Sequence, residues 1–212
     1  MPVGIETVRN GGEKRRVRQG NRSKNYAMRP HHVGRTLFTE RQIAARVRTL
    51  AGEIARDYCE DPIVIVGVLR GSFIFLADLV RALHRRGRRA MIDFMTLDSY
   101  GGGTASNGRV RLVQGFSTEV RGRRVLLVDD ILDTGRTIEY ARAYLRRRGA
   151  AEVRVCALLE KPARRVFPSV GADYIGFSVP DVFVVGYGLD YAGWHRDLPH
   201  IAEVRFADEG TR

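Results

Sequence analysis

Apolar residues recur at helical spacing in three stretches of this chain. The first stretch begins at a capping box formed by Thr39 and Gln42, and it predicts a helix over about residues 40–58. Residues 73–86 and 136–148 show the same spacing and stop at Gly87 and Gly149. Three helices are therefore predicted, each with one apolar face to bury.

Short apolar runs lie between these stretches and predict buried strands. They occupy residues 63–69, 90–97, 109–116, 125–128, 152–160 and 173–179, and the mixed segment 183–191 follows Pro180 and Asp181. Residues 98–108 are rich in glycine and small polar residues, and they are interpreted as a flexible loop. Apolar strands that alternate with helices are typical of an α/β fold with a mainly parallel sheet covered on both faces.

In sheets of this kind, ligands bind beyond the carboxyl ends of the strands. The loops that follow Val68, Leu97, Val128, Leu159 and Val185 are therefore expected to face one crevice. The polar residues that suggest chemistry lie almost entirely in these loops.

The most informative of these loops belongs to residues 125–137, VLLVDDILDTGRT. An apolar strand runs into Asp129 and Asp130, and Asp133 precedes a small, hydroxyl-rich turn that opens a helix. The N–H groups at a helix N-terminus bind anions, and the carboxylates can bind hydroxyls or a metal ion. The segment therefore predicts a site for a ligand that carries a phosphate and a sugar diol, although an acidic turn that merely caps the helix is the alternative.

Several other nucleotide and metal motifs are missing from the sequence. No GxGxxG follows a predicted strand and opens a helix, and no GxxxxGK[ST] is present. The histidines and cysteines also lack the spacing of a zinc site. These absences argue against a dinucleotide fold, a P-loop and a structural zinc.

Composition separates the start of the chain from the rest. The chain has 212 residues and a net charge of +12, and residues 1–35 hold nine Arg and Lys against two Glu. We expect residues 1–30 to be a disordered basic extension and residues 31–212 to form one domain. RNA contact by the extension is the alternative to a solvated tail, and nucleic acid is not the expected partner.

Lysine is rare in this chain. The only lysines are Lys14, Lys24 and Lys161, so Lys161 is the single lysine of the predicted domain. Because a compact ammonium differs chemically from a guanidinium, position 161 is a candidate for a specific contact, with chance as the alternative.

The sequence shows no sign of a membrane span or an exported protein. No apolar run reaches the length of about 20 residues that a membrane helix needs, and residues 1–20 lack the apolar stretch of a signal peptide. Cys59 and Cys156 are far apart and are expected to be reduced structural thiols. A cytoplasmic location without a membrane partner is the expectation.

Residues 37–205 resemble the bacterial-type hypoxanthine-guanine phosphoribosyltransferases, which use phosphoribosyl pyrophosphate (PRPP). The resemblance rests on five blocks in order, GVLRGSFIFLADL, LDSYGGG, VLLVDDILDTGRT, LLEKPARR and FVVGYGLDYAGWHRDLPHI. It implies a type I phosphoribosyltransferase fold with a small hood of N- and C-terminal segments. It also implies a purine-salvage enzyme that converts hypoxanthine or guanine into IMP or GMP, assembles as a homodimer or homotetramer, and uses Mg²⁺.

The resemblance assigns roles around the PRPP motif. Asp133 would be the general base beside purine N7, and Asp129 and Asp130 would bind the ribose hydroxyls and Mg²⁺ together with Asp190. The 5′-phosphate would lie on Thr134, Gly135, Arg136 and Thr137.

Other blocks would complete the site. The purine would be bound by three residues. Lys161 would contact the 6-oxo group, Phe183 would stack on the ring, and Val184 would bind through its backbone. The pyrophosphate would be bound by Leu69, Arg70, Gly71 and Arg196, and in such enzymes the Leu69–Arg70 peptide can be cis. Residues 98–108 would form a lid that excludes water, with Ser99 and Tyr100 at its start.

Two other functions remain as alternatives. A uracil phosphoribosyltransferase-type regulator that binds RNA shares PRPP chemistry, but such proteins usually lack a carboxylate at position 133 and lack the FVVGYGLDY block. A non-catalytic nucleotide-binding protein on this fold is less consistent with three carboxylates and Lys161.

Overall fold

The structure is a computed structural model, and it describes residues 29–58, 62–100, 109–167 and 169–207. The predicted extension falls almost wholly outside these residues, so its disorder stays a prediction. Arg29 and Pro30, which were assigned to the extension, already contact the domain. The backbone N–H of Arg29 donates to the hydroxyl of Tyr191, and the carbonyl of Pro30 accepts from the N–H of Ala207.

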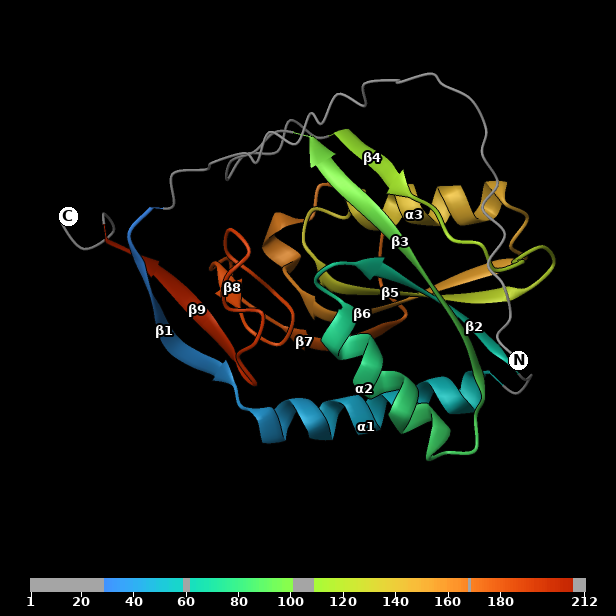
Figure 1. The fold of residues 1–212 in the computed structure, drawn as a ribbon, viewed down its shortest axis with the longest axis horizontal. Helices are drawn as coiled ribbons and strands as arrows, with labels where there is room; N and C mark the ends of the chain where they lie inside the picture. Colours follow the sequence, from blue (N-terminus) through green and yellow to red (C-terminus); the bar gives the residue numbers. More distant parts are fainter. Residues whose placement is uncertain (1–28, 59–61, 101–108, 168, 208–212) are drawn as a thin grey trace, which may run out of the picture.

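A six-stranded sheet forms the centre of the molecule (Figure 1). Its strands, in the spatial order β4-β3-β2-β5-β6-β7, are Arg109–Gln114, Ala90–Tyr100, Ile63–Leu69, Arg124–Leu132, Glu152–Glu160 and Tyr174–Ser178. All neighbouring pairs are parallel except β3 and β4. The predicted α/β class with a mainly parallel sheet is confirmed.

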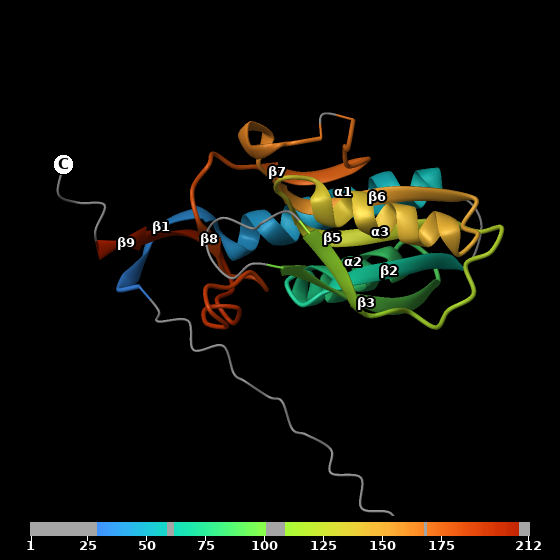
Figure 2. The same ribbon diagram turned by 90° about the horizontal axis from the view of Figure 1, so that it is seen from above.

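Helices cover both faces of the sheet. The helices α1 (Glu40–Asp57) and α2 (Phe73–His84) lie on one face, and α3 (Arg136–Arg147) lies on the other (Figures 1 and 2). Alternate residues of β5 pack on opposite faces of the sheet, since Leu126 packs with α1 and α2 while Leu127 packs with α3. The continuous apolar runs in the sequence therefore reflect strands buried on both faces. The capping box of Thr39 and Gln42 is present at the start of α1.

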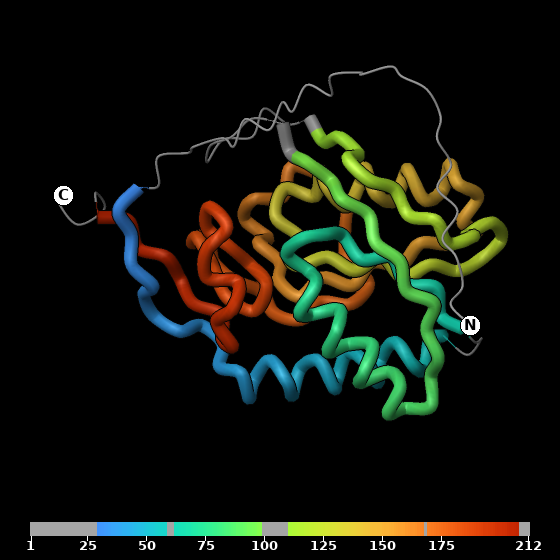
Figure 3. Tube along the Cα trace, viewed as in Figure 1, coloured from blue at the N-terminus to red at the C-terminus, as the bar shows by residue number. Residues whose placement is uncertain are grey.

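A second, smaller sheet lies beside the first and is called the hood here. It consists of β1 (His31–Phe38), β9 (Ile201–Phe206) and the short β8 (Val184–Val185), all antiparallel. Figure 3 shows the N-terminal strand lying against the C-terminal one at one end of the molecule. The loop after β8 returns from the hood toward the central sheet.

The structure corrects three details of the predicted elements. Residues 98–100 continue strand β3 and pair with β4 instead of starting a loop, and residues 101–108 lie outside the described part. Strand β5 extends through Asp129 and Asp130 to Leu132, because β6 runs alongside and pairs with it that far. In the segment 183–191 only Val184 and Val185 form a strand.

Two further properties concern the cysteines and the helices. The thiol of Cys156 is free and fully buried in β6, whereas Cys59 lies outside the described residues. Among the helices of the described chain, none has the length and apolar character required to cross a membrane.

Candidate active site

A cavity of about 880 Å³ opens at the carboxyl ends of the central strands, between the sheet and the loop after β8. It is lined by residues from at least six separate stretches of the chain, so the predicted crevice exists. The predicted site residues that line it are Leu69, Arg70, Gly71, Asp129, Asp130, Asp133, Thr134, Gly135, Thr137, Lys161, Phe183, Asp190 and Arg196.

Two adjacent carboxylates form the floor of the cavity. The side chain of Asp129 is buried, with 3% of its surface exposed, and that of Asp130 is partly buried. Burial raises the pKa of Asp129 well above its ordinary value, and the neighbouring charge of Asp130 raises it further. Burial also raises the pKa of Asp130. Ionised carboxylates in such a place are stabilised by a cation or by hydroxyl donors, which suits a sugar diol and a metal ion.

The turn from Asp133 to Thr137 leads directly into α3. Gly135 caps the helix in a left-handed conformation with φ of 87°, which a residue with a side chain rarely adopts. The helix begins at Arg136, and the first N–H groups of an α-helix have no acceptor within the helix. The turn therefore presents N–H groups and the hydroxyls of Thr134 and Thr137 to the cavity, as an anion site requires.

A second turn, Leu69 to Ser72, faces the carboxylates from the end of β2. The Leu69–Arg70 peptide is cis. Gly71 lies so close to Asp130 that a Cβ at position 71 would overlap the carboxyl group. The hood loop approaches from the other side, because a Cβ at Gly188 would overlap the carbonyl oxygen of Gly71. Backbone groups can therefore approach a ligand closely here.

The hood loop contributes an ion pair to the cavity. A guanidinium nitrogen of Arg196 lies 2.6 Å from Oδ1 of Asp190, and Oδ2 of Asp190 accepts from the N–H of Gly193 at 2.6 Å. Arg196 also donates to the carbonyl of Gly188 at 2.5 Å. Contacts within the hood loop thus hold Asp190 and Arg196 in place, and both residues line the cavity.

Lys161 and Phe183 also line the cavity. Lys161 directly follows β6 and is 8% exposed, and its backbone N–H donates to the carbonyl of Leu132 at 3.0 Å. Burial lowers the pKa of Lys161 below its ordinary value, and the Asp133 carboxylate opposes that shift. The ring of Phe183 packs edge-on against Tyr191, with 5.4 Å between ring centres. An ammonium and an aromatic ring are the groups expected for a flat, carbonyl-bearing base.

Comparison with known proteins agrees with this geometry. Residues 35–192 match the phosphoribosyl transferase domain family. The hypoxanthine phosphoribosyltransferase of Haemophilus influenzae is 43% identical over 180 residues, which cover 84% of this chain and 98% of that protein. The chain belongs to the phosphoribosyltransferase family.

Further relatives of this phosphoribosyltransferase carry related names. The hypoxanthine-guanine phosphoribosyltransferase of Aquifex aeolicus is 45% identical over 166 residues, which cover 78% of this chain and 91% of that protein. A crystal structure of the hypoxanthine-guanine phosphoribosyltransferase of Bacillus anthracis superposes with a TM-score of 0.75 at 36% identity, and the match covers 83% of this chain and all of that one. The similarity therefore extends over both the central sheet and the hood.

Two predicted residues of this phosphoribosyltransferase, Arg136 and Val184, are not among the residues that line the cavity. Arg136 is directed toward Phe167, with its guanidinium carbon 5.9 Å from the ring centre. The side chain of Val184 is buried in the hood sheet, where Val184 pairs with Glu203. Ser99 and Tyr100 lie on β3, and their side chains fall outside the described residues.

One cavity residue that the sequence analysis did not single out has a direct contact with a predicted residue. Nε of Arg164 donates to Oδ1 of Asp133 at 2.7 Å, and Nη1 of Arg164 lies 3.4 Å from Asp181. The Asp133 carboxylate is the main reason that the pKa of Arg164 is raised. The signal in the sequence was the block LLEKPARR, in which Arg164 follows Lys161 by one short 3₁₀ turn, Pro162–Arg164.

Proposed function

We propose that this protein transfers the phosphoribosyl group of PRPP to N9 of hypoxanthine or guanine, giving IMP or GMP and pyrophosphate. One observation carries this proposal: a single cavity joins the sugar-phosphate motif of residues 129–137 to Lys161, Phe183 and Asp133. The first set suits a phosphorylated ribose, and the second suits a purine with a 6-oxo group. The hypoxanthine and hypoxanthine-guanine phosphoribosyltransferases among the relatives support the same activity.

In this reaction the bond between ribose C1′ and the pyrophosphate oxygen breaks, and the bond between C1′ and purine N9 forms. The pyrophosphate leaves with the electron pair, next to the backbone of Leu69–Gly71 and the guanidinium of Arg196. Fixed positive charge and N–H donors at that place stabilise the charge that develops in the transition state. Asp133 takes or shares the proton at purine N7 as N9 attacks.

The cavity also fits a magnesium ion. Carboxylate oxygens line the cavity at Asp129, Asp130 and Asp190. Magnesium is usually bound by one or two carboxylates together with waters and substrate phosphates. Within the described residues, no three His, Cys, Asp or Glu side chains converge as a preformed metal site. When bound, the ion supplies positive charge to the pyrophosphate oxygens.

The activity is tested by incubating purified protein with PRPP, Mg²⁺ and one base at a time. We expect nucleotide and pyrophosphate in equal amounts from hypoxanthine or guanine, with little product when Mg²⁺ is chelated by EDTA. A protein that binds PRPP but forms no nucleotide from either base would be a nucleotide-binding protein instead.

Replacing Lys161 by methionine is expected to raise the KM for hypoxanthine by about 10-fold or more, because a charged donor to the 6-oxo group is lost. The KM for PRPP should stay close to that of the wild type, since Lys161 lies at the purine end of the cavity. Steady-state kinetics with each substrate varied in turn separates the two constants. An unchanged KM for the base would remove Lys161 from purine recognition.

The uracil phosphoribosyltransferase-type alternative is not favoured. The carboxylate at position 133 lines the cavity, and the relatives named above are hypoxanthine and hypoxanthine-guanine phosphoribosyltransferases. If the alternative were correct, the protein would convert uracil into its nucleotide and would not convert the purines.

We also propose that residues 31–212 form the catalytic domain and that residues 1–28 are dispensable for catalysis. Deleting residues 1–28 keeps the contacts of Arg29 and Pro30 with the hood. The truncated protein is expected to retain its kcat/KM and its melting temperature. A loss of folding on truncation would refute the predicted boundary.

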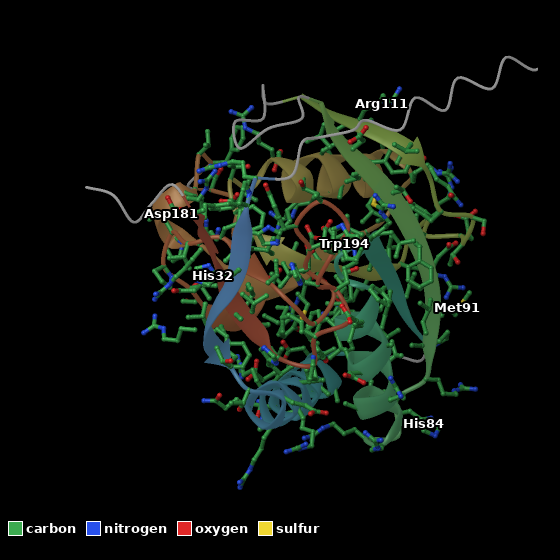
Figure 4. All side chains as sticks on the ribbon, turned by 60° about the vertical axis from the view of Figure 1, so that its left-hand side comes forward. His32, His84, Met91, Arg111, Asp181 and Trp194 are labelled. Carbon is green, nitrogen blue, oxygen red and sulfur yellow. The ribbon has the colours of Figure 1, made fainter. Side chains whose placement is uncertain are left out.

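The protein is proposed to act in the cytoplasm as a homodimer or homotetramer. Phe73, Met91, Ile92 and Phe94 are large apolar residues on α2 and β3 that expose between 38% and 45% of their surface. Met91 on β3 and His84 at the end of α2 lie on the same outer side of the molecule (Figure 4). Exposed apolar groups of this kind favour contact between copies, and light scattering during gel filtration gives the subunit number.

A further inference from the structure

Arg164 lies between two carboxylates at the purine end of the cavity. Its Nε donates to Asp133 at 2.7 Å, and its Nη1 lies 3.4 Å from Oδ1 of Asp181. Both Arg164 and Asp133 line the cavity, and each side chain is about one-third exposed.

The charges around Asp133 come from several elements. Lys161 at the end of β6 and Arg164 in the 3₁₀ turn are the cations that face it, and Asp181 faces Arg164 from the segment before β8. Asp129, Asp130, Asp190 and Arg196 line the same cavity. Among these charges, the Arg164 guanidinium is joined to the Asp133 carboxylate by a direct hydrogen bond, which fixes the orientation of the carboxyl group.

The ion pair is not needed to anchor the turn that carries Arg164. The backbone N–H of Lys161 donates to Leu132, and that of Val166 donates to Thr134, on either side of the turn. The next residue, Arg165, has its own partner in Glu160 at 2.9 Å. The contact between Arg164 and Asp133 therefore joins two side chains of the cavity, whereas other hydrogen bonds fix the backbone of the turn.

We propose that Arg164 is the positioning residue of the general base: it orients the Asp133 carboxylate through Oδ1, which leaves Oδ2 for the proton at purine N7. This inference rests on the proposed purine transfer, in which Asp133 must accept a proton while the base is bound. A fixed orientation keeps the accepting oxygen within reach of N7. Arg164 acts through Asp133 and not on PRPP.

The test is the steady-state kinetics of the full chain with hypoxanthine and PRPP varied in turn, comparing Arg164→Gln with wild type. Removing the guanidinium is expected to lower kcat by about 10-fold, because the base is less well oriented. The KM for PRPP should not change.

Two further variants separate this role from a structural one. Arg164→Lys keeps a charged hydrogen-bond donor and is expected to recover most of the wild-type kcat. Arg165→Gln removes the neighbouring guanidinium that pairs with Glu160, and its kcat should match that of the wild type.

The possible outcomes are distinct. If Arg164→Gln keeps the wild-type kcat, or if Arg164→Lys and Arg164→Gln lose kcat equally, the inference is overturned. If the wild-type protein forms no purine nucleotide, the proposed function fails before the variants are compared.

Discussion

Replacing Asp133 by asparagine is expected to lower kcat by about 10²-fold or more. The amide keeps the shape of the side chain and an oxygen that can accept from Arg164, so the local fold should persist. What is lost is the group that takes or shares the proton at purine N7. Because Asp133 is not assigned to the ribose or to the metal ion, PRPP should still bind.

The matched control is Glu139→Gln, which neutralises an exposed carboxylate in the first turn of α3. It should leave kcat unchanged. Steady-state rates give kcat, and equilibrium titration of each variant with PRPP and Mg²⁺ gives the affinity. An Asp133→Asn variant with wild-type kcat would remove Asp133 from the role of base.

Replacing Gly71 by alanine is expected to reduce kcat/KM for PRPP by about 10²-fold or more. A Cβ at this position would overlap Oδ2 and Cγ of Asp130, so either the turn or the carboxylate must move. The movement separates the groups proposed for pyrophosphate from those proposed for ribose, and a displacement of about 1 Å can cost about 10²-fold in rate.

Gly171→Ala is the control for this substitution. Nothing lies within 4 Å of a Cβ at position 171, and its backbone φ is not in the left-handed region. This variant should match wild type in kcat/KM. Equal activity of Gly71→Ala and wild type would show that the turn and Asp130 need not lie so close together.

The sequence alone predicted the central sheet well, because its signal is local. Strand β2 is apolar throughout, β5 and β6 contain the apolar runs 125–128 and 155–159, and the helices between them have apolar residues on one face. The hood could not be found in this way. Strand β1 mixes apolar and polar residues without a clear period, and it pairs with β9, about 170 residues further along the chain. Only the family resemblance indicated that these two ends meet.

The site shows the same division between local and non-local information. The motif around Asp129 predicted chemistry from spacing, and the structure places it on the cavity floor. The depth to which Asp129 is buried depends on the pairing of β5 with β6, which spacing does not specify. The contact of Arg164 with Asp133 joins residues 31 positions apart, and a long flexible side chain allows many partners. Such a contact has to be observed in a structure.

The central claim is that one cavity accepts PRPP together with a 6-oxopurine. The most direct measurement is a competition in one tube, in which the protein receives PRPP, Mg²⁺ and equal concentrations of hypoxanthine, guanine, adenine and uracil, and the nucleotides are identified by mass spectrometry. We expect IMP, GMP or both, with pyrophosphate in equal total amount and no UMP. UMP as the only product would contradict the claim.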